Sequence, residues 1–202
     1  MSPTGLRERK KQKTKAAIQR AAMRLFKKHG YEETTVEQIA AAADISESTF
    51  FNYFPSKEDV VIYDEYDPMM FAALASAPPG ETLRQTFERV IGELGAVFVA
   101  DSDVILERAK LSLEVPELRS RAWEEFEKAR EMFAQIMAAR TGRDSKDFEI
   151  QLAAMTLIAA GFQAMVEWVR LGGKGKMLDL FLRALEFVSY DEVLDRLDQG
   201  AS

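Results

Sequence analysis

Residues 35–57 read TVEQIAAAADISESTFFNYFPSK and predict two short helices joined by a tight turn. Thr35 and Gln38 form a capping-box pair for the first helix, expected over 36–43. Ser46 caps the second, expected over 46–54, and Asp44 lies in the turn, where it tolerates the left-handed conformation. Helices this short need a shared core. The apolar side chains placed to supply it are Val36, Ile39, Ala40, Ile45, Phe50 and Phe54.

This arrangement is the helix-turn-helix pattern, whose second helix enters the major groove of DNA. Residues 46–61, SESTFFNYFPSKEDVV, resemble the signature of the TetR family of regulators, in which a Tyr-Phe pair ends the recognition helix and Pro-Ser-Lys follows. Residues 16–35 are similar as well, so the resemblance covers about 12–64. It implies a three-helix DNA-binding domain over 1–56 and a larger helical domain for effector binding and dimerisation over 57–202.

The composition indicates a globular protein of 202 residues, 47% of them hydrophobic, with no cysteine for a disulfide or a thiolate metal site. Charge or glycine interrupts every apolar run before it reaches the length of a membrane span. The chain has a single histidine, no phosphate-cradling glycine loop and no HExxH motif. We therefore expect a cytoplasmic protein that is not an enzyme and holds no cofactor or metal.

Charge is distributed unevenly along the chain. The net charge is −6, yet residues 1–30 hold ten Lys or Arg against Glu8 alone. A basic segment that adjoins a helix-turn-helix is typical of a nucleic-acid-binding arm on an acidic body. The alternative is that the run is merely a solvated helix face.

Apolar spacing predicts helices through the rest of the chain and no strand, so the fold class is all-α. Residues 1–9 are expected to be disordered. A helix that begins after the Ser56 cap should stop or kink near Tyr66, before Pro68. The other helices are expected over 10–28, 83–100, 103–115, 116–141, 144–172, 176–188 and 190–197.

The resemblance also implies which side chains meet DNA. Phosphate contacts fall to Thr35, Thr49, Tyr53 and Lys57, which are hydroxyl donors or a full positive charge. Base edges would be read by Glu47, Ser48 and Asn52. Phe51 stands where the family usually has a phosphate-binding tyrosine. Either that phosphate contact is lost, or Phe51 instead packs on a thymine methyl or a sugar. The basic residues Arg9, Lys10, Lys11 and Lys13 would reach the backbone or a minor groove.

The resemblance also implies a homodimer, in which two late helices, 148–171 and 176–188, would pair with their copies in a four-helix bundle. A two-fold dimer matches an inverted-repeat operator in double-stranded DNA. The alternative is that both helices are core of a single chain. The small and apolar residues assigned to the close approach are Ala153, Ala154, Leu157, Ala160, Gly161, Ala164 and Trp168.

The middle helices would enclose a pocket for a hydrophobic effector, although such apolar stripes are also ordinary core. Residues 104–142 loosely resemble the branch of the TetR family that senses acyl-CoA-like ligands, which implies an elongated lipophilic effector. The predicted function is a repressor released from its operator by this effector, with the helix after Ser56 as lever; an activator or an effector-independent regulator is the alternative. The predicted pocket residues are Phe71, Phe87, Ile91, Leu94, Phe98, Arg108, Phe126 and Met165.

Overall fold

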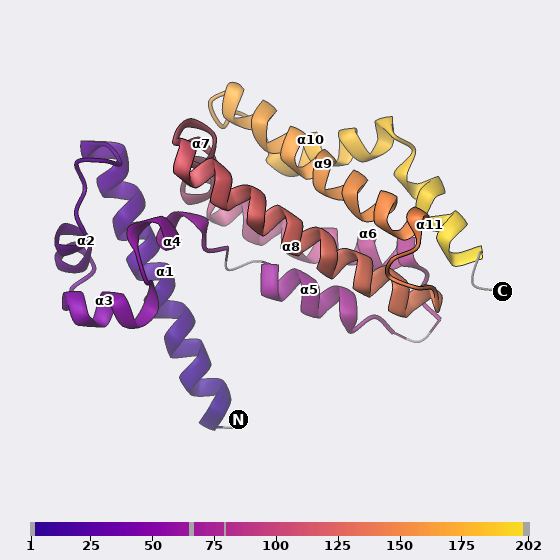
Figure 1. The fold of residues 1–202 in the computed structure, drawn as a ribbon, viewed down its shortest axis with the longest axis horizontal. Helices are drawn as coiled ribbons and strands as arrows, with labels where there is room; N and C mark the ends of the chain where they lie inside the picture. Colours follow the sequence, from indigo (N-terminus) through magenta and orange to yellow (C-terminus); the bar gives the residue numbers. More distant parts are fainter. Residues whose placement is uncertain (1–2, 65–66, 79, 200–202) are drawn as a thin grey trace. The chain divides into compact units, whose positions relative to one another are not determined.

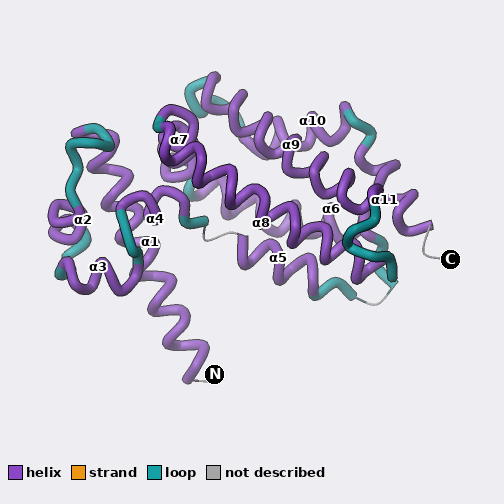
Figure 2. Tube along the Cα trace, in the orientation of Figure 1, coloured by secondary structure: helices purple, strands orange, loops and turns teal. Residues whose placement is uncertain are grey.

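The fold is all-α, as the apolar spacing predicts. The computed structural model describes residues 3–64, 67–78 and 80–199, and these contain eleven helices and no strand (Figures 1 and 2). The helices are α1 (Pro3–His29), α2 (Val36–Ala42), α3 (Glu47–Tyr53), α4 (Lys57–Ile62), α5 (Asp67–Ala75), α6 (Leu83–Ala100), α7 (Ser102–Glu114), α8 (Pro116–Thr141), α9 (Phe148–Arg170), α10 (Met177–Phe187) and α11 (Tyr190–Gln199).

The helices form two compact units. The first holds α1 to α4 together with residues 110–122, and the second holds α5, α6, α9 to α11 and the remaining parts of α7 and α8. Helix α4 belongs to the first unit because Val60 and Val61 are buried there. The Gln19 amide of α1 donates to the carbonyls of Val60 and Tyr63, each at 2.8 Å. The boundary expected between residues 56 and 57 therefore falls inside a compact unit.

Helix α1 is longer than the sequence pattern predicts. It begins at Pro3 rather than near Lys10, so the expectation of disorder up to residue 9 is wrong from Pro3 onward. Proline suits the first turn of a helix, and the Arg, Lys and Glu residues that follow are good helix formers. The helix ends as expected, because Gly30 adopts φ +89° directly after His29.

The helix-turn-helix forms through local contacts that the sequence predicts. Thr35 Oγ1 accepts from the Gln38 N–H at 3.2 Å, and Gln38 Oε1 accepts from the Thr35 N–H at 3.0 Å. Asp44 adopts φ +56° in the turn. Phe50 and Phe54 of the second helix segment and Ile39 of α2 are all fully buried, and α2 and α3 contact each other, so the two helices share one core. That core fixes the face that α3 leaves exposed.

The stop or kink predicted near Tyr66 falls outside the described residues, and Pro68 neither ends nor kinks α4. Helix α4 already ends at Ile62, and Pro68 lies in the first turn of α5. A first-turn residue has no intrahelical acceptor for its N–H, so proline costs little there.

Helix α9 is central to the core of the second unit. It begins at Phe148 rather than Asp144, because Asp144 makes a turn in which its carboxylate accepts from the Lys146 N–H at 2.8 Å. Tyr190 is buried and donates its hydroxyl to the Ala153 carbonyl at 2.9 Å. By length and composition α9 is apolar enough to cross a membrane, but its inner face is buried core. The buried side chains of α9 are Ile150, Ala153, Ala154, Leu157, Ala160, Ala164 and Trp168.

The predicted dimer contacts on α9 are wrong, because the residues assigned to them lie on its inner face. Six of the seven residues assigned to a close approach between copies are buried within their own chain, and Gly161 is half-buried. These residues are core, as the alternative interpretation held. The opposite face of α9 remains apolar and open, since Phe148, Leu152 and Met155 are 74%, 52% and 37% exposed. A helix that is apolar all round is normally covered on every side.

Candidate nucleic-acid interface and apolar cavity

Helix α3 presents a mixed polar and apolar face to solvent. Glu47, Ser48 and Asn52 are exposed, and Phe51 is 51% exposed. Phe50, next to Phe51 in the chain, is fully buried, and the two rings meet edge to face with centroids 5.5 Å apart. The predicted base-reading residues therefore lie on the open side of α3. Phe51 is not a core residue, in agreement with its separation from Phe50 and Phe54 in the sequence analysis.

Hydroxyl groups gather at the start of α3. Ser46 Oγ accepts from the Thr49 N–H at 3.1 Å and lies 2.9 Å from both Ser48 Oγ and Thr49 Oγ1. Ser46 thus caps the helix and also orients two hydroxyls that the sequence assigns to DNA. Thr35 is exposed at the start of α2, while Tyr53 is half-buried at the end of α3.

Lys57 has a structural role that the sequence does not reveal. Its side chain is 19% exposed, and the ammonium donates to the Tyr31 carbonyl at 3.0 Å. The same group lies 4.3 Å from the centroid of the Tyr31 ring and 4.0 Å from the Glu32 carboxylate. Lys57, which the resemblance assigns to a phosphate contact, therefore also stabilises the turn after α1.

Glu58 extends this arrangement. The Tyr31 hydroxyl donates to Glu58 Oε1 at 2.9 Å. Burial, assisted by this bond, raises the pKa of Tyr31, so its phenol stays neutral. Burial alone would raise the pKa of Glu58, but hydrogen bonds from Ser56, its own backbone N–H and Tyr31 outweigh it and lower that pKa.

The basic residues of α1 lie mainly on its surface. Lys10, Lys11 and Lys13 are exposed, and the Arg9 side chain lies outside the part of the chain that the structure describes. Lys15 differs, because its ammonium sits 4.1 Å from the centroid of the Tyr63 ring. The other exposed basic residues of α1 are Arg7, Arg20, Arg24, Lys27 and Lys28.

Residues 110–122 join the first unit through Arg121. One guanidinium nitrogen lies 2.6 Å from Asp59 Oδ1, and another donates to Ser56 Oγ at 3.4 Å. Asp59 also accepts from the Ser56 hydroxyl at 2.7 Å. The partners are 62 residues apart in the chain, so no local sequence pattern points to this contact.

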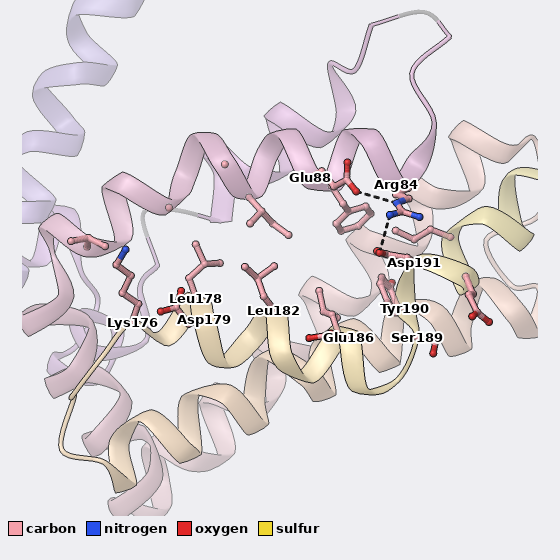
Figure 3. Close-up of a pocket in the computed structure, with 18 residues that line it drawn as sticks. Arg84, Glu88, Lys176, Leu178, Asp179, Leu182, Glu186, Ser189, Tyr190 and Asp191 are labelled. Carbon is pink, nitrogen blue, oxygen red and sulfur yellow. Dashed lines mark hydrogen bonds and ion pairs between the residues drawn. The ribbon is translucent and has the colours of Figure 1, made fainter.

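The second unit contains an apolar cavity between α6 and α10, with a volume of about 940 Å³ (Figure 3). Two predicted pocket residues, Phe87 and Ile91, line it. Helix α10 supplies much of the opposite wall through Leu178, Leu182 and Leu185. From the sequence, α10 is predicted to lie in the dimer interface instead. The sequence signal that could have found this wall is the strong amphipathicity of α10. In the structure none of the α10 side chains is fully buried, so its apolar face is available to line a cavity.

The structure does not bring the other predicted pocket residues to this cavity. Phe71 packs on Phe133 with ring centroids 5.1 Å apart, and Phe126 meets Phe162 at 5.7 Å. Arg108 and Met165 are half-buried elsewhere in α7 and α9. The side chains of Leu94 and Phe98 lie outside the described residues. Within residues 3–64, 67–78 and 80–199, no three His, Asp or Glu are placed to hold a metal ion.

Comparison with known proteins agrees with this geometry. Residues 18–63 match the model of bacterial regulatory proteins of the tetR family, and residues 78–191 match the MftR C-terminal domain. The HTH-type transcriptional regulator TcmR of Streptomyces glaucescens is 33% identical, and the match covers 96% of this chain and 86% of TcmR. The chain belongs to the TetR family. It is therefore a DNA-binding transcriptional regulator, from a family of regulators rather than enzymes.

Solved structures of TetR-family proteins share the fold. The FadR repressor of Thermus thermophilus, solved with lauroyl-CoA, is 26% identical with a TM-score of 0.56, over 85% of this chain and 91% of FadR. FadR of Bacillus subtilis, solved with stearoyl-CoA, is 20% identical with a TM-score of 0.59, over 85% of this chain and 95% of that one. At such identity the second likeness concerns the fold alone.

Proposed function

We propose that this TetR-family protein is a repressor that binds an inverted-repeat operator as a homodimer and is released by a hydrophobic small molecule. The observation that carries the proposal is one chain with both an open, polar recognition helix and a separate apolar cavity of about 940 Å³. The likeness to the Thermus repressor solved with lauroyl-CoA supports it. Such a regulator acts in the cytoplasm, where its operator lies.

In this proposal α3 lies in the major groove. Glu47, Ser48 and Asn52 read base edges, and the exposed Phe51 ring packs on a thymine methyl or a sugar. Thr35 and the oriented hydroxyl of Thr49 contact phosphates, as does Tyr53. Lys57 contributes positive charge near the backbone while it holds the turn after α1. The exposed basic residues of α1 add a contribution that depends on salt and not on sequence.

The homodimer would form through α9 and α10, with α9 using the face opposite to the one first expected. Phe148, Leu152 and Met155 follow one another at helical spacing on that face, and all three are exposed. Phe187, at the end of α10, is 89% exposed. A second copy that covers these side chains would remove a large apolar surface from water.

The effector would act by preferring the dimer conformation that cannot span both half-sites. The contact of Arg121 with α4 is better placed to couple effector binding to the DNA-binding helices than Pro68 is. Helix α8 is continuous from Pro116 to Thr141, and its first turns are tied to α4 by Arg121 and Asp59. A displacement of α8 would thereby pass to the helix that follows α3.

Footprinting of the DNA beside the gene tests the proposed function. We expect protection of an inverted repeat that disappears when a hydrophobic effector is added. Lauroyl-CoA, which was solved with the Thermus repressor, is tested beside uncharged and cationic hydrophobic molecules. Protection that no ligand removes would favour an effector-independent regulator. Protection accompanied by increased transcription would favour an activator.

A further inference from the structure

The cavity between α6 and α10 has an unusual balance of charge. Its walls are apolar, but its lining includes five carboxylates and two basic side chains. One of these, Arg84, is already neutralised: its guanidinium lies 3.0 Å from Glu88, 3.2 Å from Asp191 and 3.8 Å from Asp195. Three carboxylates around one guanidinium leave this part of the cavity rim acidic.

The acidic excess is concentrated at one end. Figure 3 shows Glu88, Arg84, Asp191 and Glu186 toward the end formed by the start of α6 and the end of α10. Lys176 lies at the other end, with Asp179 close to it (Figure 3). The apolar walls lie between these ends, so the cavity has a long apolar body and one strongly acidic end, which we call its acidic mouth.

We propose that this cavity binds a lipophilic cation, with its apolar body between α6 and α10 and its positive group at the acidic mouth. The inference rests on the proposed function, because it names the chemical class of the effector. An anionic chain, and still more the phosphates of an acyl-CoA, would meet like charge at that mouth. A lipophilic amine or quaternary ammonium would instead balance the negative charge that remains on the carboxylates around Arg84.

Glycine on α6 gives a direct way to block the cavity. Gly92 lines it, and a Cβ added there would meet no atom within 4 Å. The longer side chain of Gly92→Leu therefore fills free volume and leaves every acidic residue in place. The matched control, Gly92→Ala, adds a single methyl group. Both changes favour the helix over glycine, so neither should impair folding.

The experiment is calorimetric titration of the full-length protein with decyltrimethylammonium, decanoate and decanoyl-CoA, below their micelle concentrations. We expect the cation to bind with a Kd at least about tenfold lower than that of either anion, since the mouth attracts one and repels the others. Glu186→Gln should weaken the cation by about fivefold, as for an exposed ion pair, and should not weaken decanoate. Gly92→Leu should abolish cation binding and Gly92→Ala should retain it.

Three results would overturn the inference. Tighter binding of decanoate or decanoyl-CoA would show that the acidic mouth does not select the ligand. Cation binding that survives Gly92→Leu would show that the cation binds acidic residues on the surface and not the cavity. Conversion of a wild-type dimer to a monomer by Gly92→Leu would mean that a second copy of the chain occupies the cavity.

These outcomes are separate from failure of the proposed function. Operator binding by the ligand-free protein is measured on its own, and a protein that protects no DNA would refute the repressor even if the cation binds. Conversely, a repressor that decanoyl-CoA releases and the cation does not bind would keep the proposed function and discard the cationic ligand.

Discussion

The contact between Arg121 and Asp59 allows a quantitative test, because its two members lose different numbers of bonds when replaced. The guanidinium lies 2.6 Å from Asp59 Oδ1, with the side chains 38% and 25% exposed. Exposed ion pairs contribute less than about 1 kcal/mol, whereas hydrogen bonds to charged groups contribute up to about 3 kcal/mol. For this half-buried pair we expect a coupling energy of about 1 kcal/mol.

The single variants should therefore differ. Arg121→Ala removes the ion pair and a long contact to Ser56, and should lower the free energy of unfolding by about 1 kcal/mol. Asp59→Ala also removes the 2.7 Å bond from the Ser56 hydroxyl and should cost about 2 kcal/mol. The double variant should cost about 2 kcal/mol, rather than the sum of the two, because the pair is lost only once.

Urea denaturation of the four proteins measures this cycle, and the coupling should shrink at high salt. In footprinting titrations, Arg121→Ala should bind the operator yet need more effector for release, because α8 is no longer tied to α4. A coupling energy below about 0.3 kcal/mol, within the scatter of independent sites, would show that Arg121 and Asp59 do not stabilise each other.

Three further variants probe the remaining contacts. Lys57→Ala should lower the free energy of unfolding by about 1 kcal/mol, because its ammonium donates to the Tyr31 carbonyl. It should also reduce the slope of log K for DNA binding against log salt by about one, the value for one lost phosphate contact. A loss of stability with an unchanged slope would show that Lys57 does not contact DNA. The lowered pKa of Glu58 contributes stability above its ordinary value of 4.5, and this is lost as the pH falls through the lower folded value. Glu58→Gln should therefore lose less stability than wild type in acid urea titrations below that pH, and parallel curves would contradict this. Leu152→Glu should convert the dimer to a monomer in light scattering, since it puts a charge on the open face of α9, and an intact dimer would exclude that face.

The sequence was most informative where a contact spans only a few residues. The capping box of Thr35 and Gln38, the cap at Ser46 and the left-handed Asp44 each depend on neighbours within one turn, so residue type and spacing were sufficient to predict them. The same holds for the separation of exposed Phe51 from buried Phe50. These local features carry nearly all of the candidate DNA-binding surface.

Contacts between distant segments could not be predicted in this way. Helix α9 carries apolar residues of its own on both faces. Periodicity alone therefore could not distinguish the core face, which holds Ala153, from the open face, which holds Leu152. The cavity depends on how α10 packs against α6, which no spacing within either helix specifies. For the same reason the resemblance and the charge of Lys57 predicted a phosphate contact but not its bond to Tyr31, which lies 26 residues away in the chain.

In the proposed function, the open face of α3 reads a specific DNA sequence. The most direct test is fluorescence anisotropy of the protein with the inverted repeat found beside its gene and with a scrambled duplex of equal length, at physiological salt. We expect the inverted repeat to bind at least about a thousandfold more tightly, and Asn52→Ala to lose about tenfold on the repeat and little on the scrambled duplex. Equal affinity for the two duplexes, unaffected by Asn52→Ala, would show that α3 does not read the sequence of the DNA.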